Sequence, residues 1–319
     1  MYSAEPLMLQ NQLLQKAESR VETETGASQA VVPAPLVTVY IPTRNRPELL
    51  DRAVQSCLSQ SYKLFELIIV DDCSDEHYRA QIEAIACSDP RIRLLTTDSA
   101  SGACVARNLA IQSAKGVFIT GLDDDDEFLP GRLQHFVQEW QKHPEAAFLC
   151  TGYQVVTPTL TFSYGRREEK LTASDLLWRN AVGNQLFTRT DYLRQITGFD
   201  PAFLSCQDYD CWIRLSQRFG KGRRLTGCSY RIWQDHSSDR ISVSKHREQG
   251  YQLLLERHGH VMNRAQRRAQ KFYWYLNTQH WQSLRLVLLS GRYTFSVALK
   301  NILMRHLPVL VFLAGGHRR

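Results

Sequence analysis

The chain has 319 residues, which is enough for one large or two ordinary domains with a sizeable core. Its net charge of +7 is concentrated at one end, because residues 257–319 contain eleven Lys or Arg and no Asp or Glu. The first 256 residues carry 28 basic and 32 acidic side chains. This distribution favours an anionic surface as the partner of the C-terminal tail, and it disfavours nucleic acid as a partner of the main domain.

Eight cysteines occur without CxxC pairs or the Cys/His spacing of zinc sites, so we expect buried, reduced thiols and a cytoplasmic protein. The first 30 residues contain acidic side chains and lack the apolar core of a signal peptide. Because no run of about 18 apolar residues lacks a charge, a membrane-spanning helix is not expected.

Residues 1–35 are polar and contain Pro33 and Pro35 near their end, which indicates an N-terminal extension and linker. Apolar runs then predict strands at 36–41, 65–70, 91–95 and 117–122. Amphipathic stretches predict a helix after each of the first three strands. This alternation is typical of an open parallel sheet with helices on both faces.

Polar side chains follow three of these strands, at the point where each strand ends. They are Thr43, Arg44 and Asn45 after the first strand, Asp71 and Asp72 after the second, and Asp123, Asp124, Asp125 and Asp126 after the fourth. In open α/β sheets, ligands bind at the carboxyl ends of the strands. A Rossmann dehydrogenase is disfavoured, because Pro42 stands where its glycine-rich phosphate loop would begin.

The four consecutive aspartates repel one another unless a cation lies among them. Short carboxylates suit Mg²⁺ or Mn²⁺, and Mg²⁺ usually combines one or two carboxylates with substrate phosphates. The cluster therefore predicts a divalent metal and a phosphate-bearing substrate. The alternative is a solvated acidic turn before a helix that begins near Pro130.

The ordered segments V-T-V-Y-I-P-T-R-N-R, L-I-I-V-D-D-C-S-D, S-G-A-C-V-A-R-N-L-A and F-I-T-G-L-D-D-D-D-E-F-L-P resemble the inverting family 2 glycosyltransferases of GT-A fold. The resemblance covers roughly residues 36–235. It implies an α/β fold, with a Rossmann-like open mixed sheet and helices on both faces. We expect a nucleotide-sugar half at 36–150 and an acceptor half at 151–255, which together form the GT-A domain.

The resemblance also implies a set of residues for the nucleotide-sugar. These are Pro42, Thr43, Arg44, Asn45, Asp71, Gly102, Arg107, Asp123 and Asp124, with Asp72 supporting a loop. For Arg107, the alternative is packing against the acidic loop, which is the run of aspartates at 123–126. The family's motif is Asp, small residue, Asp, Asp, and here Asp124 replaces the small residue.

In that motif we take Asp123 and Asp125 as the pair that holds the ribose and the metal, with Asp126 as a rival for the metal. The resemblance suggests that His236 lies near the diphosphate or the metal, and a structural histidine is the alternative. The expected cofactor is Mn²⁺ or Mg²⁺. It would stabilise the leaving nucleoside diphosphate as the glycosidic bond breaks.

The segment Q-D-Y-D-C-W-I-R resembles the family's Glu-Asp pair at a helix start, whose Asp deprotonates the acceptor hydroxyl. We assign this base to Asp208. Gln207 stands in place of the Glu, so the neighbouring carboxylate is missing. Asp210 and Arg214 have the spacing of an ion pair along one helix.

Three further residues are candidates for contact with the acceptor: Asn184, Gln185 and Trp212. Polarity at the edge of the core is the alternative for the two amides, and a buried core position is the alternative for the tryptophan. Thr172 and Asp175 have the spacing of a helix N-cap.

The tail at 256–319 is expected to be helical, with apolar faces flanked by cationic residues. Such helices fit an anionic membrane interface, which predicts a protein held on the inner face of the cytoplasmic membrane. The alternative is a helical pair that packs on the catalytic domain or on a second subunit.

Together these features predict a metal-dependent inverting glycosyltransferase. It would move a sugar from a nucleoside diphosphate donor of the UDP class to a hydroxyl of a glycan or lipid-linked glycan, in lipopolysaccharide or other cell-surface polysaccharide synthesis. A nucleotidyltransferase is one alternative, but it would carry a basic glycine-rich loop near the first strand. A non-catalytic membrane or nucleic-acid adaptor is another, and Gln207 keeps it open.

Overall fold

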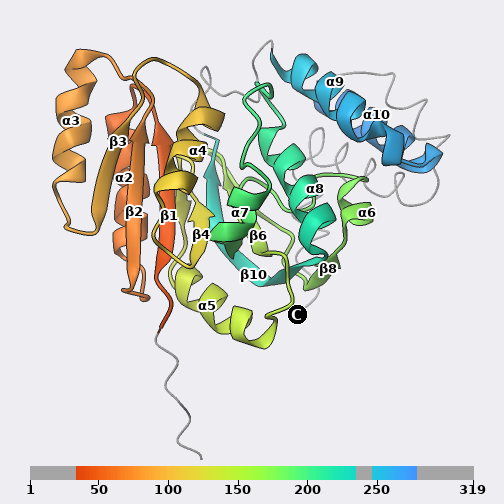
Figure 1. The fold of residues 1–319 in the computed structure, drawn as a ribbon, viewed down its shortest axis with the longest axis horizontal. Coiled ribbons are helices and arrows are strands. Elements are labelled where there is room, and N and C mark those ends of the chain that lie inside the picture. The colour runs from red at the N-terminus through yellow and green to blue at the C-terminus, as the bar shows by residue number, and fades with distance from the viewer. Residues whose placement is uncertain (1–33, 235–245, 279–319) are drawn as a thin grey trace, which may run out of the picture. The chain divides into compact units, whose positions relative to one another are not determined.

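The computed structural model describes residues 34–234 and 246–278 of the chain (Figure 1). The described residues from Pro35 onward belong to one structural unit. Its framework is a ten-stranded sheet with the strand order β3-β2-β1-β4-β9-β6-β10-β5. Outside this path, β7 pairs with β6 and β8 pairs with β10.

The strands are β1 (Val37–Thr43), β2 (Phe65–Asp71), β3 (Ile92–Thr96), β4 (Phe118–Gly121), β5 (Asp126–Phe128), β6 (Leu149–Val156), β7 (Thr161–Tyr164), β8 (Glu169–Leu171), β9 (Phe187–Arg189) and β10 (Gly222–Trp233). The helices are α2 (Pro47–Leu58), α3 (Glu76–Ala86), α4 (Ala103–Ser113), α5 (Arg132–Lys142), α6 (Ala173–Leu176), α7 (Thr190–Gln195), α8 (Gln207–Phe219), α9 (His246–His258) and α10 (Arg264–Thr278), with a short 3₁₀ turn η2 (Gly259–Val261).

The first four strands form the predicted parallel region of the sheet. β3, β2, β1 and β4 are parallel neighbours, and α2, α3 and α4 connect them in chain order. The strand and helix alternation predicted for this region is confirmed. As a result, the polar residues that follow β1, β2 and β4 meet at one edge of the sheet.

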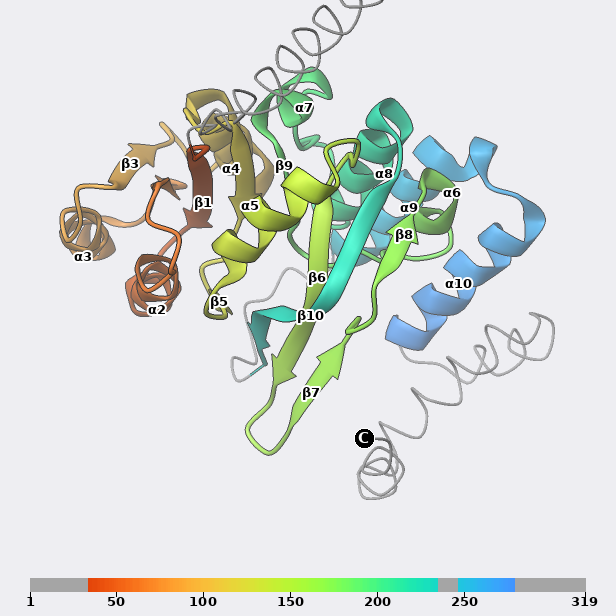
Figure 2. The same cartoon turned by 90° about the horizontal axis from the view of Figure 1, so that it is seen from below.

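The rest of the sheet is mixed. β9 lies between β4 and β6 and is antiparallel to both. β10 is parallel to β6 but antiparallel to β5 and β8. β9, from the predicted acceptor half, therefore pairs with β4, from the predicted nucleotide half. Figure 2 shows β6 and β7 side by side as an antiparallel hairpin.

Helices cover both faces of the sheet, as the sequence predicted. Along β1, Val37, Val39 and Ile41 belong to the core that includes α2, α3 and α5. Tyr40, one position out of phase, belongs to the opposite core with α4 and α8. This period of two follows from the alternation of side chains along a strand.

The last two described helices, α9 and α10, lie next to α8 and α6, at the end of the molecule opposite α3 (Figure 1). Gln270 Nε2 donates to the carbonyl of Leu177 at 2.8 Å and to Tyr209 Oη at 2.6 Å. Gln266 Nε2 donates to the carbonyl of Ser174 at 2.9 Å. These contacts attach α10 to α6 and α8.

The predicted start of the tail at residue 256 falls inside α9. Up to residue 278, the described part of this tail contains the end of α9, η2 and α10, and α10 packs on the domain. The remainder of the predicted tail, 279–319, lies outside the described residues. Within the described part of the chain, no helix has both the length and the hydropathy that a membrane crossing requires.

Candidate active site

A pocket of about 600 Å³ opens at the carboxyl edge of β1 and β4. Its lining includes Pro42 and Thr43 at the end of β1, Arg44 and Arg46 after it, Asp72 after β2, Arg107 of α4, Asp123, Asp124, Asp125 and Asp126 after β4, Asn184 before β9, and Gln207 and Asp208 of α8. Six of the nine residues predicted for the donor therefore line one cavity together with Asp208, although they lie up to about 165 residues apart in the chain. The other three, Asn45, Asp71 and Gly102, are not part of this lining.

Asp123 accepts hydrogen bonds from three side chains. Arg107 Nη2 donates to its Oδ1 at 3.0 Å, and so does Gln185 Nε2 at 3.0 Å. Asn184 Nδ2 donates to Oδ2 at 3.2 Å. Arg107 is buried and also lines the pocket, so it both packs against the acidic loop and borders the ligand space.

Asp124 and Asp125 interact with the segment after β1. Thr43 Oγ1 donates to Asp124 Oδ2 at 2.9 Å, and Arg46 Nη1 lies 3.4 Å from Asp124 Oδ1. Burial raises the pKa of Asp124 to about 7, an effect that Arg46 opposes and Asp125 reinforces. Arg46 Nη1 also lies 3.9 Å from Asp125 Oδ2, and Arg52 Nη2 donates to the Asp125 carbonyl at 2.8 Å.

Asp126 differs from its neighbours because it begins β5 and is only 1% exposed. Its Oδ1 accepts from the backbone N–H of Trp233 at 3.3 Å, and its Oδ2 accepts from Asn184 Nδ2 at 3.5 Å. Its carboxylate thus joins the acidic loop to β10 and to the segment before β9.

The two aspartates after β2 have different surroundings. Asp71 is 1% exposed, and its Oδ1 accepts from the backbone N–H of Ser74 at 3.1 Å and from the Ser74 hydroxyl. Asp72 lines the pocket and accepts from the backbone N–H groups of Ser101 at 2.9 Å and Gly102 at 2.7 Å. Asp72 therefore holds the loop before α4, and Gly102 begins that helix with a φ of 88°.

Asn45 faces the neighbouring loop. Its Nδ2 donates to Asp75 Oδ2 at 3.0 Å, and its Oδ1 accepts from the Asp75 backbone N–H at 2.8 Å. Its own backbone N–H donates to Ser74 Oγ at 2.8 Å. These bonds tie the segment after β1 to the turn after β2, whereas Pro42 and Arg44 border the pocket itself.

Asp208 lies in the first turn of α8, where the helix dipole favours a carboxylate. Asn180 Nδ2 donates to its Oδ2 at 2.9 Å. Burial raises the pKa of Asp208 to about 6 and Asp123 adds to this effect, whereas the Tyr209 backbone N–H, Arg107 and Asn180 oppose it. A carboxylate with this pKa is ionised near neutral pH and suits general-base chemistry.

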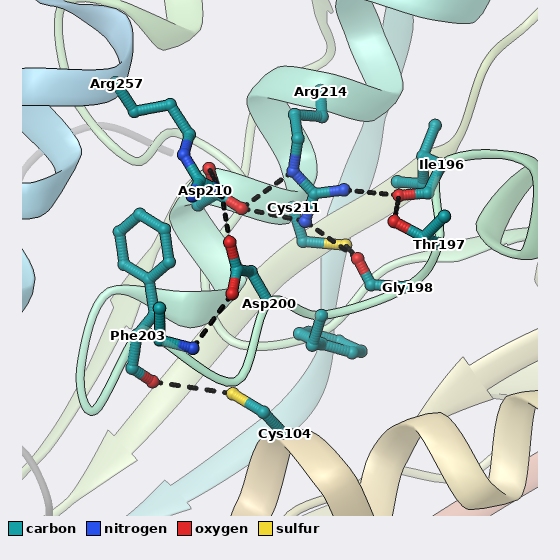
Figure 3. Close-up of polar contacts among 12 residues, drawn as sticks. Cys104, Ile196, Thr197, Gly198, Asp200, Phe203, Asp210, Cys211, Arg214 and Arg257 are labelled. Carbon is teal, nitrogen blue, oxygen red and sulfur yellow. Dashed lines mark hydrogen bonds and ion pairs between the residues drawn. The ribbon is translucent and has the colours of Figure 1, made fainter.

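A buried ion-pair network holds the other side of α8 (Figure 3). Asp210 has no exposed surface, and Arg214 donates to its Oδ2 at 2.8 Å, as the spacing predicted. His258 Nε2 lies 2.9 Å and Arg257 Nη1 3.5 Å from Asp210 Oδ1. Burial alone would raise the pKa of Asp210, but the His258 hydrogen bond and Arg214 hold it below its usual value.

Trp212 corrects one prediction. Its side chain is 1% exposed, its Nε1 donates to the Gly183 carbonyl at 3.0 Å, and its ring packs edge-on against Phe199. It is therefore a core residue and not part of the pocket lining. Gln185 is also buried, and its Oε1 accepts from Tyr40 Oη at 3.2 Å while its Nε2 binds Asp123.

Two residues of the site were not singled out from the sequence. Arg46 has a visible signal, because it is the second arginine of T-R-N-R. Asn180 has none, since it lies 28 positions before Asp208 and no motif surrounds it. His236 lies outside the described residues.

Comparison with known proteins identifies the class to which this fold and pocket belong. The family model for Glycosyl transferase family 2 matches residues 38–205. The chain is 35% identical over 269 residues to the Escherichia coli K12 protein named "Putative colanic acid biosynthesis glycosyl transferase WcaA", which covers 81% of this chain and 94% of that protein. The chain therefore belongs to glycosyl transferase family 2.

A second relative agrees with this class, and a solved structure shares the fold. The Escherichia coli "UDP-Glc:alpha-D-GlcNAc-diphosphoundecaprenol beta-1,3-glucosyltransferase WfgD" is 29% identical over 182 residues, which cover 56% of this chain and 69% of that protein. S. aureus TarS 1–349 in complex with UDP-GlcNAc superposes with a TM-score of 0.62 at 14% identity, covering 83% of this chain and 88% of that chain. The GT-A fold implied by the sequence is confirmed.

Proposed function

We propose that this chain transfers a sugar, with inversion, from a nucleoside diphosphate donor of the UDP class to a hydroxyl of a glycan or lipid-linked glycan in cell-surface polysaccharide synthesis. One observation carries the proposal: Asp208 and the four aspartates after β4 line the same pocket. The names of the relatives support the pathway class, and the ligands named for TarS support UDP.

Two buried groups support a nucleotide site. Asp71 Oδ2 has no hydrogen-bond partner among the described residues, and an N–H donor of a nucleobase would satisfy it. Arg107 Nε and Nη1 also lack partners within residues 34–234 and 246–278, and this guanidinium borders the pocket. Phosphate oxygens of the donor are suitable acceptors for those N–H groups.

The carboxylates of the acidic loop suit a divalent cation that takes one or two of its ligands from the protein and the rest from phosphates and water. Among residues 34–234 and 246–278, no three His, Cys, Asp or Glu side chains form a metal cluster by themselves. Asp125 is favoured over Asp126, whose carboxylate accepts from Trp233 and Asn184. When bound, Mn²⁺ or Mg²⁺ would neutralise charge on the leaving diphosphate.

Asp208 would act as the base. Its carboxylate accepts the proton of the acceptor hydroxyl, while the oxygen forms a bond to the anomeric carbon on the face opposite the diphosphate. The bond from that carbon to the phosphate oxygen breaks, and its electron pair leaves with the nucleoside diphosphate. Arg107 adds positive charge beside the acidic loop throughout this displacement.

Membrane attachment at the inner face of the cytoplasmic membrane is part of the same proposal. Four cationic residues of α10, Arg264, Arg267, Arg268 and Lys271, are exposed at positions i, i+3, i+4 and i+7, while Gln266 and Gln270 face the domain. This spacing places the cations along one side of the helix, which suits an anionic lipid surface.

The first test is calorimetric titration of UDP, with GDP for comparison, in Mn²⁺ and then in EDTA. We expect metal-dependent binding of UDP that Asp125→Ala abolishes and Asp208→Asn retains. Sugar transfer from UDP-sugars should be lost in Asp208→Asn. A protein that binds no nucleotide under any metal condition would overturn the proposal and favour a non-catalytic adaptor.

A further inference from the structure

The segment between α6 and β9 carries an asparagine whose two amide atoms have different partners. Asn180 Oδ1 accepts from the backbone N–H groups of Val182 at 3.2 Å and Gly183 at 3.1 Å. Asn180 Nδ2 donates to Asp208 Oδ2 at 2.9 Å. The reversed amide would turn its oxygen toward a carboxylate and its NH₂ toward two donors, so the surroundings determine the orientation.

The same segment is anchored to the helix that carries the base. The Gly183 carbonyl accepts from Trp212 Nε1 of α8 at 3.0 Å. Ala181 and Val182 are buried, and Arg224 of β10 donates to the Ala181 carbonyl. Asn180 is therefore held on a supported backbone, and Trp212, one turn after Asp208, fixes the distance between the two elements.

We propose that Asn180 is a positioning residue for the base: its amide holds Asp208 Oδ2 and stabilises the ionised carboxylate, so that the carboxylate can receive the acceptor proton. This inference rests on the proposed function, because it gives Asn180 a role through Asp208. Gln207 cannot supply a charge beside the base, and the hydrogen bond from Asn180 provides instead a neutral donor of fixed direction.

Other titratable groups face Asp208 and remain in place when Asn180 changes. They are Arg107 and Cys104 of α4, Asp123 after β4, Tyr40 of β1, and Cys206 and Cys211 beside or within α8. Burial raises the pKa of the Cys104 and Cys206 thiols to about 11 and that of Cys211 to about 12. These thiols therefore do not titrate in the range where Asp208 does.

The experiment is a ¹³C NMR titration of the full chain labelled at the aspartate carboxyl carbons, with Asp208→Asn used to assign the Asp208 signal. It needs no substrate. Asn180→Asp keeps an oxygen for Val182 and Gly183 but turns a carboxylate toward Asp208, whereas Asn180→Ala removes both functions. We expect the Asp208 titration to move up by about one to two pH units in Asn180→Ala and at least as far in Asn180→Asp.

Asn263→Asp is the matched control, because Asn263 Oδ1 accepts from the Gln266 N–H at the start of α10 and Asn263 is not among the residues that line the pocket. It introduces the same charge, and we expect the Asp208 titration to stay unchanged. If folded Asn180→Asp and Asn180→Ala leave that titration unmoved, Asn180 is only a loop support and the inference is wrong. Retained transfer in Asp208→Asn would instead overturn the proposed base.

Discussion

At the scale of single residues, the environment of Asp208 determines how transfer should depend on pH. Burial raises the pKa of this carboxyl to about 6, and only its ionised form can accept a proton. Below that pH the ionised fraction falls about tenfold per unit. We therefore expect kcat/KM to rise with pH through about 6 and then to level off.

The measurement is a pH–rate profile of sugar transfer at subsaturating acceptor, with donor binding recorded at each pH by calorimetry. The binding data separate the titration of Asp208 from that of Asp124, whose pKa burial raises to about 7. An acid limb near pH 4, the value of an ordinary exposed aspartate, would contradict a raised pKa for the group that accepts the proton.

At the scale of secondary-structure elements, the end of β4 depends on a glycine. A Cβ atom at Gly121 would lie 2.2 Å from Gln185 Oε1 and 2.5 Å from Tyr40 Cζ. Gln185 also donates to Asp123, so its displacement would disturb the acidic loop. We expect Gly121→Ala to lower the free energy of unfolding by about 1–3 kcal/mol and to weaken UDP binding.

Urea unfolding followed by circular dichroism measures the first effect, and calorimetry measures the second. Gly259→Ala is the control, because a Cβ there meets nothing within 4 Å. Equal stability of the Gly121 and Gly259 variants would contradict this account of the strand end.

The attachment of α9 to α8 leads to a second prediction for an element. His258 is 3% exposed and lies 2.9 Å from the fully buried carboxylate of Asp210. Removal of its imidazole leaves that carboxylate with fewer donors, at an expected cost of about 1–3 kcal/mol in the free energy of unfolding for His258→Ala. His260→Ala, at an exposed position two residues later, should have little effect.

Chemical denaturation of both histidine variants tests this expectation. If His258→Ala is as stable as His260→Ala, the contact between His258 and Asp210 does not attach α9 to α8. Arg214 and Arg257, which Figure 3 shows beside Asp210, would then hold this carboxylate without the imidazole.

At the scale of the whole molecule, the distribution of cysteines predicts the response to thiol reagents. All eight cysteines are free, four of them are buried, and Cys87 at the end of α3 is exposed. We expect a thiol-specific reagent to modify Cys87 first in the native protein and all eight after denaturation. Mass spectrometry of partially modified protein identifies the site, and earlier modification of Cys57 or Cys150 would contradict this burial pattern.

The fold and the donor side of the site were largely predictable from the sequence, because their signals are local. Apolar runs of strand length and helical spacing lie within single segments, so that α2, α3 and α4 follow the first three strands as predicted. The aspartates follow β4 directly, and parallel strands bring their polar ends to one edge of the sheet. The order of the four motif segments along the chain indicated glycosyltransferase family 2.

Contacts between distant segments required the tertiary structure. Whether Trp212 faces a pocket or the core depends on how α8 packs against Phe199 and Gly183, and a tryptophan suits either surrounding. The short β5 forms because Asp126 pairs with Ile232, which is more than a hundred residues away. Sequence alone located the first four strands and the polar residues near their ends, because those signals are local, although β1 continues through Pro42 to Thr43. Tertiary packing decided which side chain, such as Asn180, meets Asp208, because such partners share no local pattern.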